Sequence, residues 1–192
     1  MKTKTLVLIA FFVMVFAQLA VPVQMVTHNN DVLETGKLYK FKTQPIDPYD
    51  PFRGKYINLS FEEDDLFIKK EIPTANAIYA TLTTEKGFAK ISKISNQKPK
   101  SGDYIKLNDV RMYKTVDQYQ VLLNFPFDRF YMNEYKAPEA EKQYNQAVSA
   151  IQNNVYALVA VKDGEAIVKD VIINNISIKD YSKQKTKKEK PL

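Results

Sequence analysis

A long apolar run near the amino terminus constrains the fold of this chain more than any other feature. Residues 6–26 carry no charged side chain, and only Gln18 and Gln24 among them are polar. In an α-helix that rises about 1.5 Å per residue, such a run covers roughly the 30 Å hydrocarbon core of a bilayer. Lys2 and Lys4 precede the run and favour a cytoplasmic amino terminus with an exported body. The sequence therefore predicts a single-pass anchor in the cytoplasmic (inner) membrane, with the carboxy-terminal domain extracytoplasmic.

A cleaved signal peptide is the alternative interpretation of the same run. Val15 and Ala17 fit the small-x-small pattern that precedes a cleavage site. The hydrophobicity continues well beyond Ala17, however, which favours an uncleaved anchor. Both interpretations place the body outside the cytoplasm. The chain contains no cysteine, which excludes a cysteine-linked lipid anchor, disulfides, a thiolate metal site and a cysteine nucleophile.

The net charge of +6 is concentrated at the two ends of the chain. Lys2 and Lys4 supply +2, and the segment 182–192, with five lysines against Glu189, supplies +4. The body between these ends is therefore neutral overall. Nucleic-acid-binding domains concentrate positive charge on a folded face, so this distribution predicts no nucleic-acid partner. We expect the lysine tail to be a solvated terminus, with contact to anionic headgroups or acidic wall polymers as the alternative.

After residue 36 the sequence acquires the alternation of apolar and polar residues that is typical of β-strands. The expected strands span residues 37–42, 55–61, 77–83, 88–94, 104–107, 112–116, 118–125, 155–161, 166–173 and 176–178. Between two of them, Asp163 and Gly164 predict a two-residue hairpin turn, because both central positions of such a turn favour positive φ.

One helix interrupts the predicted strands. Pro138 suits the first helical turn, Glu139 and Glu141 complement the amino-terminal dipole, and apolar residues recur at helical spacing as far as Ile151. The predicted fold is mainly β (α+β), with an N-terminal transmembrane helix followed by one β-rich domain that has a single packed helix. The predicted segments are a cytoplasmic N-terminus 1–5, an anchor 6–26, a neck 27–35, the β-rich extracytoplasmic domain 36–181 and a disordered Lys-rich tail 182–192.

A cluster of turn-forming and charged residues precedes the strand expected at 55–61. Asp47 and Asp50 are each followed by proline, a pair that favours the start of a turn, and Arg53 stands close to both carboxylates. Gly54 permits a positive φ or a bulge where the strand begins. The pattern predicts a braced loop in which Arg53 pairs with Asp47 or Asp50, with a recognition or catalytic loop as the alternative.

Alternation within this strand separates two faces. The core face carries Ile57, Leu59 and Phe61. Tyr56, Asn58 and Ser60 lie on the other face, where they are available to water, a second sheet or a ligand.

Residues 47–61 resemble the family named for its G-D-Y-x-x-L-x-Y motif. The matching positions are Asp47-Pro48-x-Asp50-x-x-Arg53-Gly54-x-Tyr56-x-x-Leu59-x-Phe61. Lys55 replaces the aspartate of the motif, and Phe61 replaces its final tyrosine. The resemblance implies a short amino-terminal membrane span and a β-rich extracytoplasmic domain, in a family of unknown function. Because Lys55 cannot replace a catalytic carboxylate, a structural role of the motif is favoured.

Two further correspondences accompany the motif. Residues 127–134 are similar to the family's Arg-aromatic-aromatic-x-x-Glu stretch, in which we expect an ion pair between Arg129 and Glu134, with Tyr131 beside it. Residues 102–107 repeat the pattern of 54–59, as either a chance match or a duplicated β unit.

Other candidate chemistry is weaker. His28 lies in the neck, where we expect contact with solvent or headgroups rather than a place in a catalytic triad. Residues 62–65, with four carboxylates in a row, lack the glycine and alternation of a calcium loop and predict a solvated turn. A set of aromatic residues favours the core over a glycan-stacking platform. These residues are Tyr113, Tyr119, Phe125, Phe127, Phe130, Tyr131 and Tyr135.

We therefore predict a membrane-anchored binding or accessory protein of a bacterial-type cell envelope, without catalytic residues, cofactor or metal. Its expected partner is another membrane or envelope protein. The candidate binding residues are Asp47, Asp50, Arg53, Gly54, Tyr56, Asn58, Arg129, Tyr131 and Glu134. The alternative is an envelope hydrolase that acts on peptide or glycan through carboxylates near Asp47, Asp50 or Glu134. Such an enzyme requires carboxylates of raised pKa in an open pocket, whereas a binding protein holds them against arginine or backbone amides.

Overall fold

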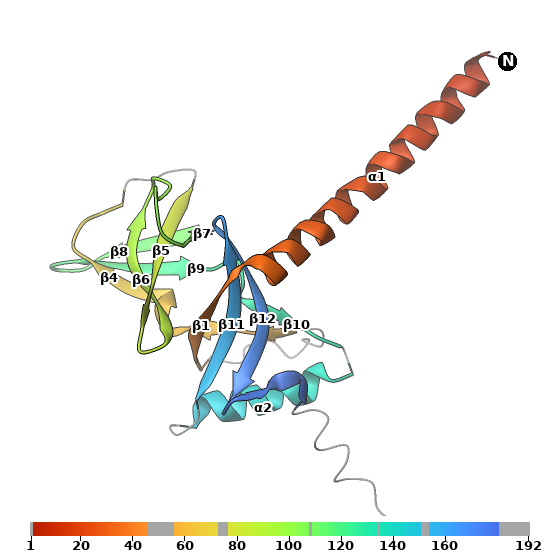
Figure 1. The fold of residues 1–192 in the computed structure, drawn as a ribbon. Helices are drawn as coiled ribbons and strands as arrows, with labels where there is room; N and C mark the ends of the chain where they lie inside the picture. The colour runs from red at the N-terminus through yellow and green to blue at the C-terminus, as the bar shows by residue number, and fades with distance from the viewer. Residues whose placement is uncertain are drawn as a thin grey trace, which may run out of the picture.

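A long amino-terminal helix and a β-rich body make up the chain (Figure 1). The computed structural model describes residues 2–45, 56–72, 77–107, 109–133, 135–150 and 154–180. The predicted loop residues Asp47, Asp50, Arg53 and Gly54, together with Glu134 and the lysine tail, lie outside these ranges.

Helix α1 (Lys2–Thr35) extends from the body for most of its length (Figure 1). Its apolar side chains are exposed on all sides, as Leu8, Phe12 and Phe16 illustrate. A helix that is apolar all round requires either a protein core or a lipid surround, and the described residues of the body cover none of its most apolar window.

The helix does not end where the apolar run ends. It continues through the predicted neck, residues 27–35, and its last turns contact β11 and β12. Val32 is buried there. The neck is therefore part of one continuous helix that is packed against the body.

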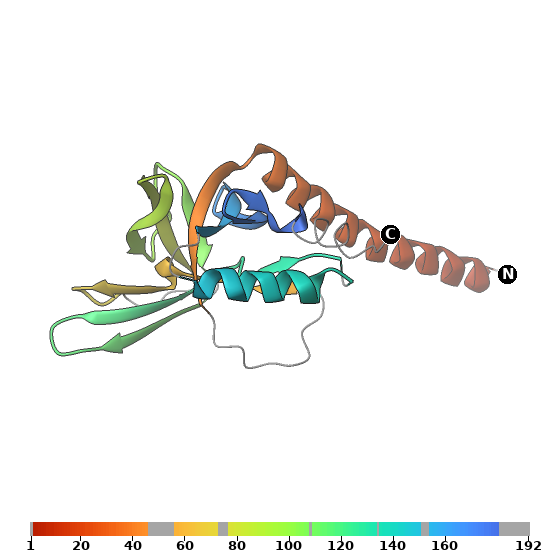
Figure 2. The same ribbon diagram turned by 90° about the horizontal axis from the view of Figure 1, so that it is seen from below.

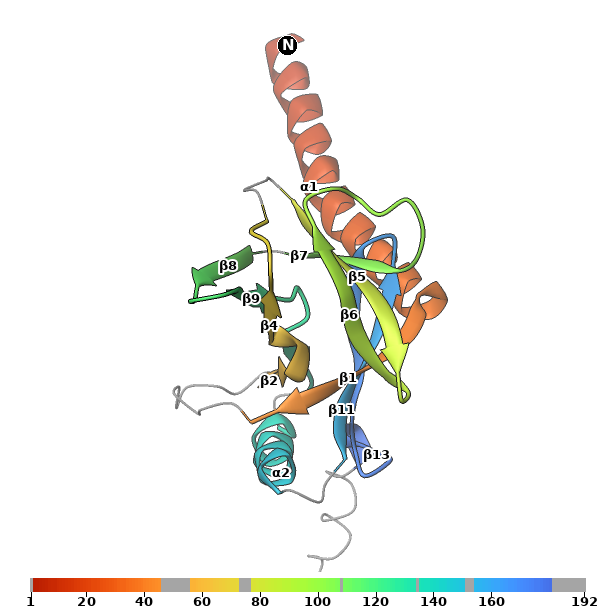
Figure 3. The same ribbon diagram turned by 90° about the vertical axis from the view of Figure 1, so that its left-hand side faces the viewer.

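Four antiparallel sheets form the described part of the body. Their strand orders are β13-β12-β11-β1-β3, β10-β2, β4-β9-β8 and β6-β5-β7. The strands are β1 (Lys37–Gln44), β2 (Tyr56–Asn58), β3 (Ser60–Phe61), β4 (Asp65–Ile68), β5 (Ile78–Glu85), β6 (Phe88–Ser95), β7 (Tyr104–Leu107), β8 (Asp109–Lys114), β9 (Tyr119–Asn124), β10 (Arg129–Tyr131), β11 (Val155–Lys162), β12 (Glu165–Ile173) and β13 (Ile176–Ser177). One short helix, α2 (Ala137–Ser149), packs beneath β1, β2 and β11 in the views of Figures 1 and 3.

The predicted strand at 55–61 is divided between two sheets. β2 pairs with β10, whereas β3 pairs with β1. Between them the Leu59 N–H donates to the Asp128 carbonyl over 2.8 Å. The predicted alternation is confirmed, because Ile57, Leu59 and Phe61 are all buried. The strand pattern alone gave no indication of this change of partner.

The centre of the core is a cluster of four phenylalanine rings. Phe41 lies 5.7 Å from Phe61, 5.7 Å from Phe125 and 5.1 Å from Phe127 between ring centroids. Tyr144 of α2 is buried against the same core. Phe61, which stands at the final tyrosine of the motif, therefore serves core packing, and a hydroxyl at this position would require a buried partner.

The predicted hairpin turn is confirmed. Asp163 and Gly164 have φ angles of 53° and 93°. A Cβ at Gly164 would also lie 2.5 Å from the ring of Tyr104, so glycine is required twice over at this position. Tyr104 opens β7, which pairs with β5, whereas the motif strand β2 pairs with β10. The repeated six-residue patterns therefore lie in different sheets with different partners.

Candidate functional site

Four of the predicted binding residues come together on the two-stranded sheet of β2 and β10. Arg129 lies opposite Asn58, and Tyr131 lies opposite Tyr56. The Arg129 guanidinium carbon stands 5.1 Å from the centroid of the Tyr56 ring, and the rings of Tyr56 and Tyr131 are 5.5 Å apart. This sheet with Tyr56, Asn58, Arg129 and Tyr131 is called the ribbon below.

The charge of the ribbon is carried by Arg129. A hydrogen bond with the Tyr131 hydroxyl raises the pKa of Arg129, and the Asp128 carboxylate raises it further. The nearest ion-pair distance to Asp128, from Arg129 Nε to Oδ1, is 3.9 Å, which is a loose contact between half-exposed groups. Since Tyr131 is 65% exposed, the ribbon presents a cation framed by two tyrosine rings.

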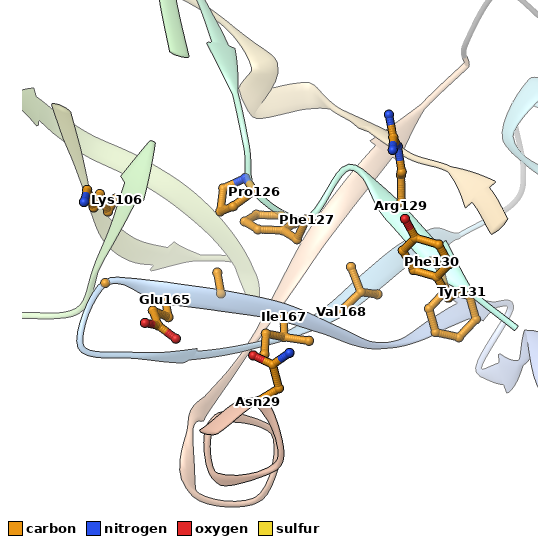
Figure 4. A pocket seen from close by; sticks show the side chains of 12 residues that line it. Asn29, Lys106, Pro126, Phe127, Arg129, Phe130, Tyr131, Glu165, Ile167 and Val168 are labelled. Atoms are coloured by element: carbon orange, nitrogen blue, oxygen red, sulfur yellow. The ribbon is translucent and has the colours of Figure 1, made fainter. Parts of the chain in front are cut away.

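A cleft of about 590 Å³ separates the ribbon from the β11–β12 hairpin and the end of α1. Figure 4 places Lys106 and Glu165 towards one end of it and Arg129, Phe130 and Tyr131 towards the other. Its remaining lining is Asn29, Pro126, Phe127, Gly164, Ala166, Ile167 and Val168. The cleft therefore has a largely apolar wall, and the charged ends of Lys106 and Arg129 point away from that wall in Figure 4.

Polar contacts fasten the end of α1 to the β11–β12 hairpin. His28 Nε2 lies 2.6 Å from Glu165 Oε2, a contact that the sequence did not predict, while its side chain stays 55% exposed, in agreement with the expected contact with solvent. Lys162 Nζ donates to the Asp31 carboxylate over 2.6 Å and to the Thr35 hydroxyl over 2.8 Å. The Lys162 ammonium lowers the pKa of Asp31. These contacts fix the direction of α1 relative to the domain.

Gly36 lies where the end of α1 packs closely against the backbone of β11. Its N–H donates to the Val32 carbonyl over 2.9 Å. A Cβ at Gly36 would collide with that carbonyl oxygen and would lie 3.2 Å from the Val161 nitrogen. Backbone atoms cannot yield as a flexible side chain does, so any larger residue must displace the helix end from β11.

Gly36→Ala is therefore expected to loosen the junction at a cost of about 1–3 kcal/mol in the free energy of unfolding, the usual range for overpacking. Limited proteolysis of the full chain in detergent should then cut faster between α1 and β1. Gly87→Ala is the control. Its added Cβ meets no atom within 4 Å, but alanine is strained at the φ of 85°, so it lowers stability away from the junction and should leave junction cleavage unchanged. Equal protection of both variants and the wild type would contradict a tightly packed junction.

The acidic segment 62–65 is not the solvated turn that we expected. It begins with a short 3₁₀ helix, η1 (Glu62–Asp64), in which Glu63 is buried. The Glu63 carboxylate accepts from Lys90 Nζ over 2.6 Å and from the Ile91 N–H over 3.0 Å. Lys90 and Ile91 of β6 therefore hold one carboxylate of this run, that of Glu63, inside the structure.

Asp64 is the most perturbed carboxyl of this segment. Burial raises its pKa to about 6, against the hydrogen bonds that it accepts from the Phe61 N–H and the Ser60 hydroxyl. It lies on a second, smaller pocket of about 260 Å³ that Asn58 and Asp128 also line. Within the described ranges no three His, Asp or Glu residues gather as metal ligands would.

The predicted aromatic set divides between core and surface. Phe125, Phe127 and Phe130 are buried, as the core interpretation requires. Tyr131, the last residue of β10, and Tyr135 beyond it are exposed. Tyr113 is half exposed on the β8–β9 hairpin, which projects from the body in Figure 2. The exposed tyrosines therefore lie on separate elements and do not form one stacking platform.

Sequence reasoning missed several residues that organise this region. Glu165 and Lys162 flank the predicted hairpin turn, and that turn was the one local signal that pointed to them. Asp64 and Lys90 carried no such signal, because their importance arises from burial and from pairing between distant strands.

The match to known families covers most of the chain. A model of the GDYXXLXY protein family matches residues 18–171. The chain belongs to the GDYXXLXY protein family. No curated protein and no solved structure matches it significantly. Residues 3–35 of this GDYXXLXY protein form a helix long and apolar enough to span a membrane, a property that signal sequences share.

The geometry shows what the described motif residues do in this GDYXXLXY protein. Leu59 and Phe61 belong to the core, while the ring of Tyr56 supports Arg129. The motif strand therefore joins the phenylalanine cluster to the ribbon, and its one tyrosine stands at the surface.

Proposed function

We propose that this protein is a membrane-anchored extracytoplasmic binding or accessory protein that engages another membrane or envelope protein through the ribbon. The observation that carries the proposal is the Arg129 guanidinium held over Tyr56 with Tyr131 beside it. Tyrosine and arginine are enriched among residues that dominate binding energy at protein interfaces. Rings that already hold the cation in place reduce the entropy lost when a partner binds.

The anchor in this proposal is α1, with the amino terminus in the cytoplasm. Its exposed apolar surface and the two lysines before it support that orientation. The fastened junction supports a role in which the domain is held at a set angle to the membrane. A protein that remains in the membrane pellet after alkaline carbonate extraction would agree with the anchor, whereas a shortened chain in the supernatant would favour the cleaved signal peptide.

Crosslinking in native membranes tests the ribbon. Arg129→Ala and Tyr56→Ala should each reduce capture of a specific partner by about tenfold or more, since hot-spot truncations cost about 2 kcal/mol. Arg111→Ala is the matched control, because Arg111 lies on β8 and pairs loosely with Asp109 over 3.4 Å. Partner capture that is unchanged in both ribbon variants, with wild-type folding by circular dichroism, would refute the proposed surface.

An envelope hydrolase is the competing proposal. Its original candidates, Asp47, Asp50 and Glu134, lie outside the described residues. Asp64 adds a carboxyl of raised pKa beside a pocket, which is the pattern of a general acid. Its Oδ2 atom, however, accepts both the Phe61 N–H and the Ser60 hydroxyl, and these contacts favour a structural role. Wall-component hydrolysis that is lost in Asp64→Asn would favour the enzyme.

A further inference from the structure

We propose that the open edge of β12 binds an extended segment of the partner protein as an added β-strand, seated in the cleft beside the ribbon. The inference rests on the proposed function in taking the occupant to be another protein, and it names the form in which that partner is recognised. Three observations carry it, namely an interruption in the strand neighbours of β12, the direction of its main-chain groups and the position of the cleft.

The outer edge of β12, which faces away from β11, has strand neighbours only at its two ends. At the hairpin turn, the Lys106 N–H of β7 donates to the Gly164 carbonyl over 2.8 Å. At the other end, β13 pairs with residues 172–173. None of the described strands pairs with residues 165–171 on this edge. The edge therefore has an opening between two strands that one further strand could fill.

Two residues in this opening direct their main-chain groups outward. Lys162 and Glu165 lie opposite each other across the two-residue turn, and the residues that flank such a turn bond to each other. Hydrogen-bonded and non-hydrogen-bonded pairs then alternate along an antiparallel ladder. Ile167 therefore bonds to β11, whereas Ala166 and Val168 point their N–H and C=O groups away from it, towards the open edge.

The opening has a defined length. The Lys169 carbonyl accepts from Lys179 Nζ over 3.1 Å, which closes the edge on that side. Residues 165–168 remain, and they cover about 13 Å at roughly 3.3 Å per residue. Unpaired N–H and C=O groups on a sheet edge are a template for another chain, and main-chain bonds to such an edge supply the affinity in β-strand addition. The occupant that these groups select is an extended peptide segment.

The cleft follows this opening. Its lining contains every residue from 164 to 168. In Figure 4, Ile167 lies on the side of Asn29, and Val168 lies on the opposite side of the hairpin, towards Phe127. A cleft that is lined from both faces of one strand lies at the edge of that strand. An added strand would therefore place alternate side chains towards Phe127 and towards Ile167, which favours apolar side chains at alternate positions.

The ribbon borders the same cleft. Arg129 and Tyr131 line it, and β10, on which they lie, pairs with β2 alone among the described strands. A partner that contacts Arg129 and Tyr131 therefore has part of its chain next to the open edge of β12. This continuity assigns the added strand to the protein that the ribbon engages.

A display library of linear peptides about ten residues long, selected against the full chain in detergent, supplies probes for the edge. The selected peptides should carry apolar residues at alternate positions. Val168→Pro should weaken their binding about tenfold or more, because proline removes an outward N–H and its ring blocks the added strand. Val168→Ala is the matched control. It shortens the same side chain but keeps the N–H, so its peptide affinity should stay within about threefold of the wild type.

Hydrogen exchange separates strand addition from a loss of folding. The Val168 amide should exchange quickly in the free chain and should gain protection when a selected peptide is bound. The Ile167 amide, which bonds to β11, should be protected in both states. Peptide binding that Val168→Pro leaves unchanged, or a Val168 amide that gains no protection, would overturn the inference. A wild-type dimer that Val168→Pro dissociates would also overturn it, by assigning the edge to a second copy of the chain.

Tyr56→Ala separates this inference from the proposed function. Tyr56 contacts Arg129 but is not among the residues that line the cleft, so the variant should lose partner crosslinking and keep peptide binding. Val168→Pro should lose both. Crosslinking in native membranes that is lost in Tyr56→Ala but unchanged in Val168→Pro would refute strand addition and leave the proposed surface in place.

Discussion

Phe41→Ala is expected to lower the free energy of unfolding by about 3–5 kcal/mol, the range for truncating a fully buried aromatic residue. Phe41 is 0% exposed and contacts Phe61, Phe125 and Phe127. Its removal would leave a cavity bounded by Phe61 on β3 and by Phe125 and Phe127, which lie between β9 and β10. These elements are held by separate strand pairings and cannot all collapse into the space. Urea unfolding of the full chain in detergent, followed by circular dichroism, measures the loss.

The matched control for Phe41 is Phe67→Ala. Phe67 lies on β4 and is 57% exposed, so its truncation should change stability by less than about 0.5 kcal/mol. Similar losses in both variants would show that the four rings do not form the centre of the core. The loss of stability in Phe41→Ala should also reduce partner crosslinking indirectly, because Phe61 and the motif residue Leu59 connect the phenylalanine cluster to the ribbon.

Asp64→Asn is expected to stabilise the protein at neutral pH, by up to about 3 kcal/mol above pH 7. Burial raises the pKa of Asp64 to about 6 from an ordinary value of 3.8, and each unit of difference is worth about 1.4 kcal/mol. The folded state therefore keeps a proton between pH 4 and 6 that the unfolded state has released. The contribution of this carboxyl to stability is complete below about pH 4 and is lost as the pH rises through 6.

A pH series separates this effect from a general gain in packing. The asparagine side chain retains an oxygen that can accept the Phe61 N–H and the Ser60 hydroxyl, so the variant should match the wild type at pH 4. The difference in the free energy of unfolding should then grow between pH 4 and 7. A constant difference at all pH values, or a destabilised variant at pH 8, would contradict a buried carboxyl of raised pKa.

The predicted binding residues show how much of the candidate site can be predicted from local sequence patterns. Tyr56 and Asn58 were assigned to one face of a strand by alternation, and Arg129 and Tyr131 by a separate similarity. The structure pairs them directly, Arg129 with Asn58 and Tyr131 with Tyr56. That pairing depends on the register of two strands that are distant in the chain. The alternation of residues within one strand predicts neither its partner strand nor its register.

The acidic segment shows the opposite outcome. Four consecutive carboxylates predict solvation, because moving a charged group out of water costs free energy. Lys90 and the Ile91 N–H reverse this preference for Glu63. Their contribution is visible only when β6 is placed beside η1, which explains why the sequence pattern failed at this point.

The sequence by itself determined the apolar helix, the β-rich body and the hairpin turn at Asp163 and Gly164, because each follows from a period or a conformational preference within a few residues. Only the tertiary structure decided which residues from distant parts of the chain contact each other. His28 contacts Glu165 across 137 positions of the chain, and Arg129 reaches Tyr56 across a strand pair. Such contacts are set by sheet order and strand register, which depend on burying the whole core at once.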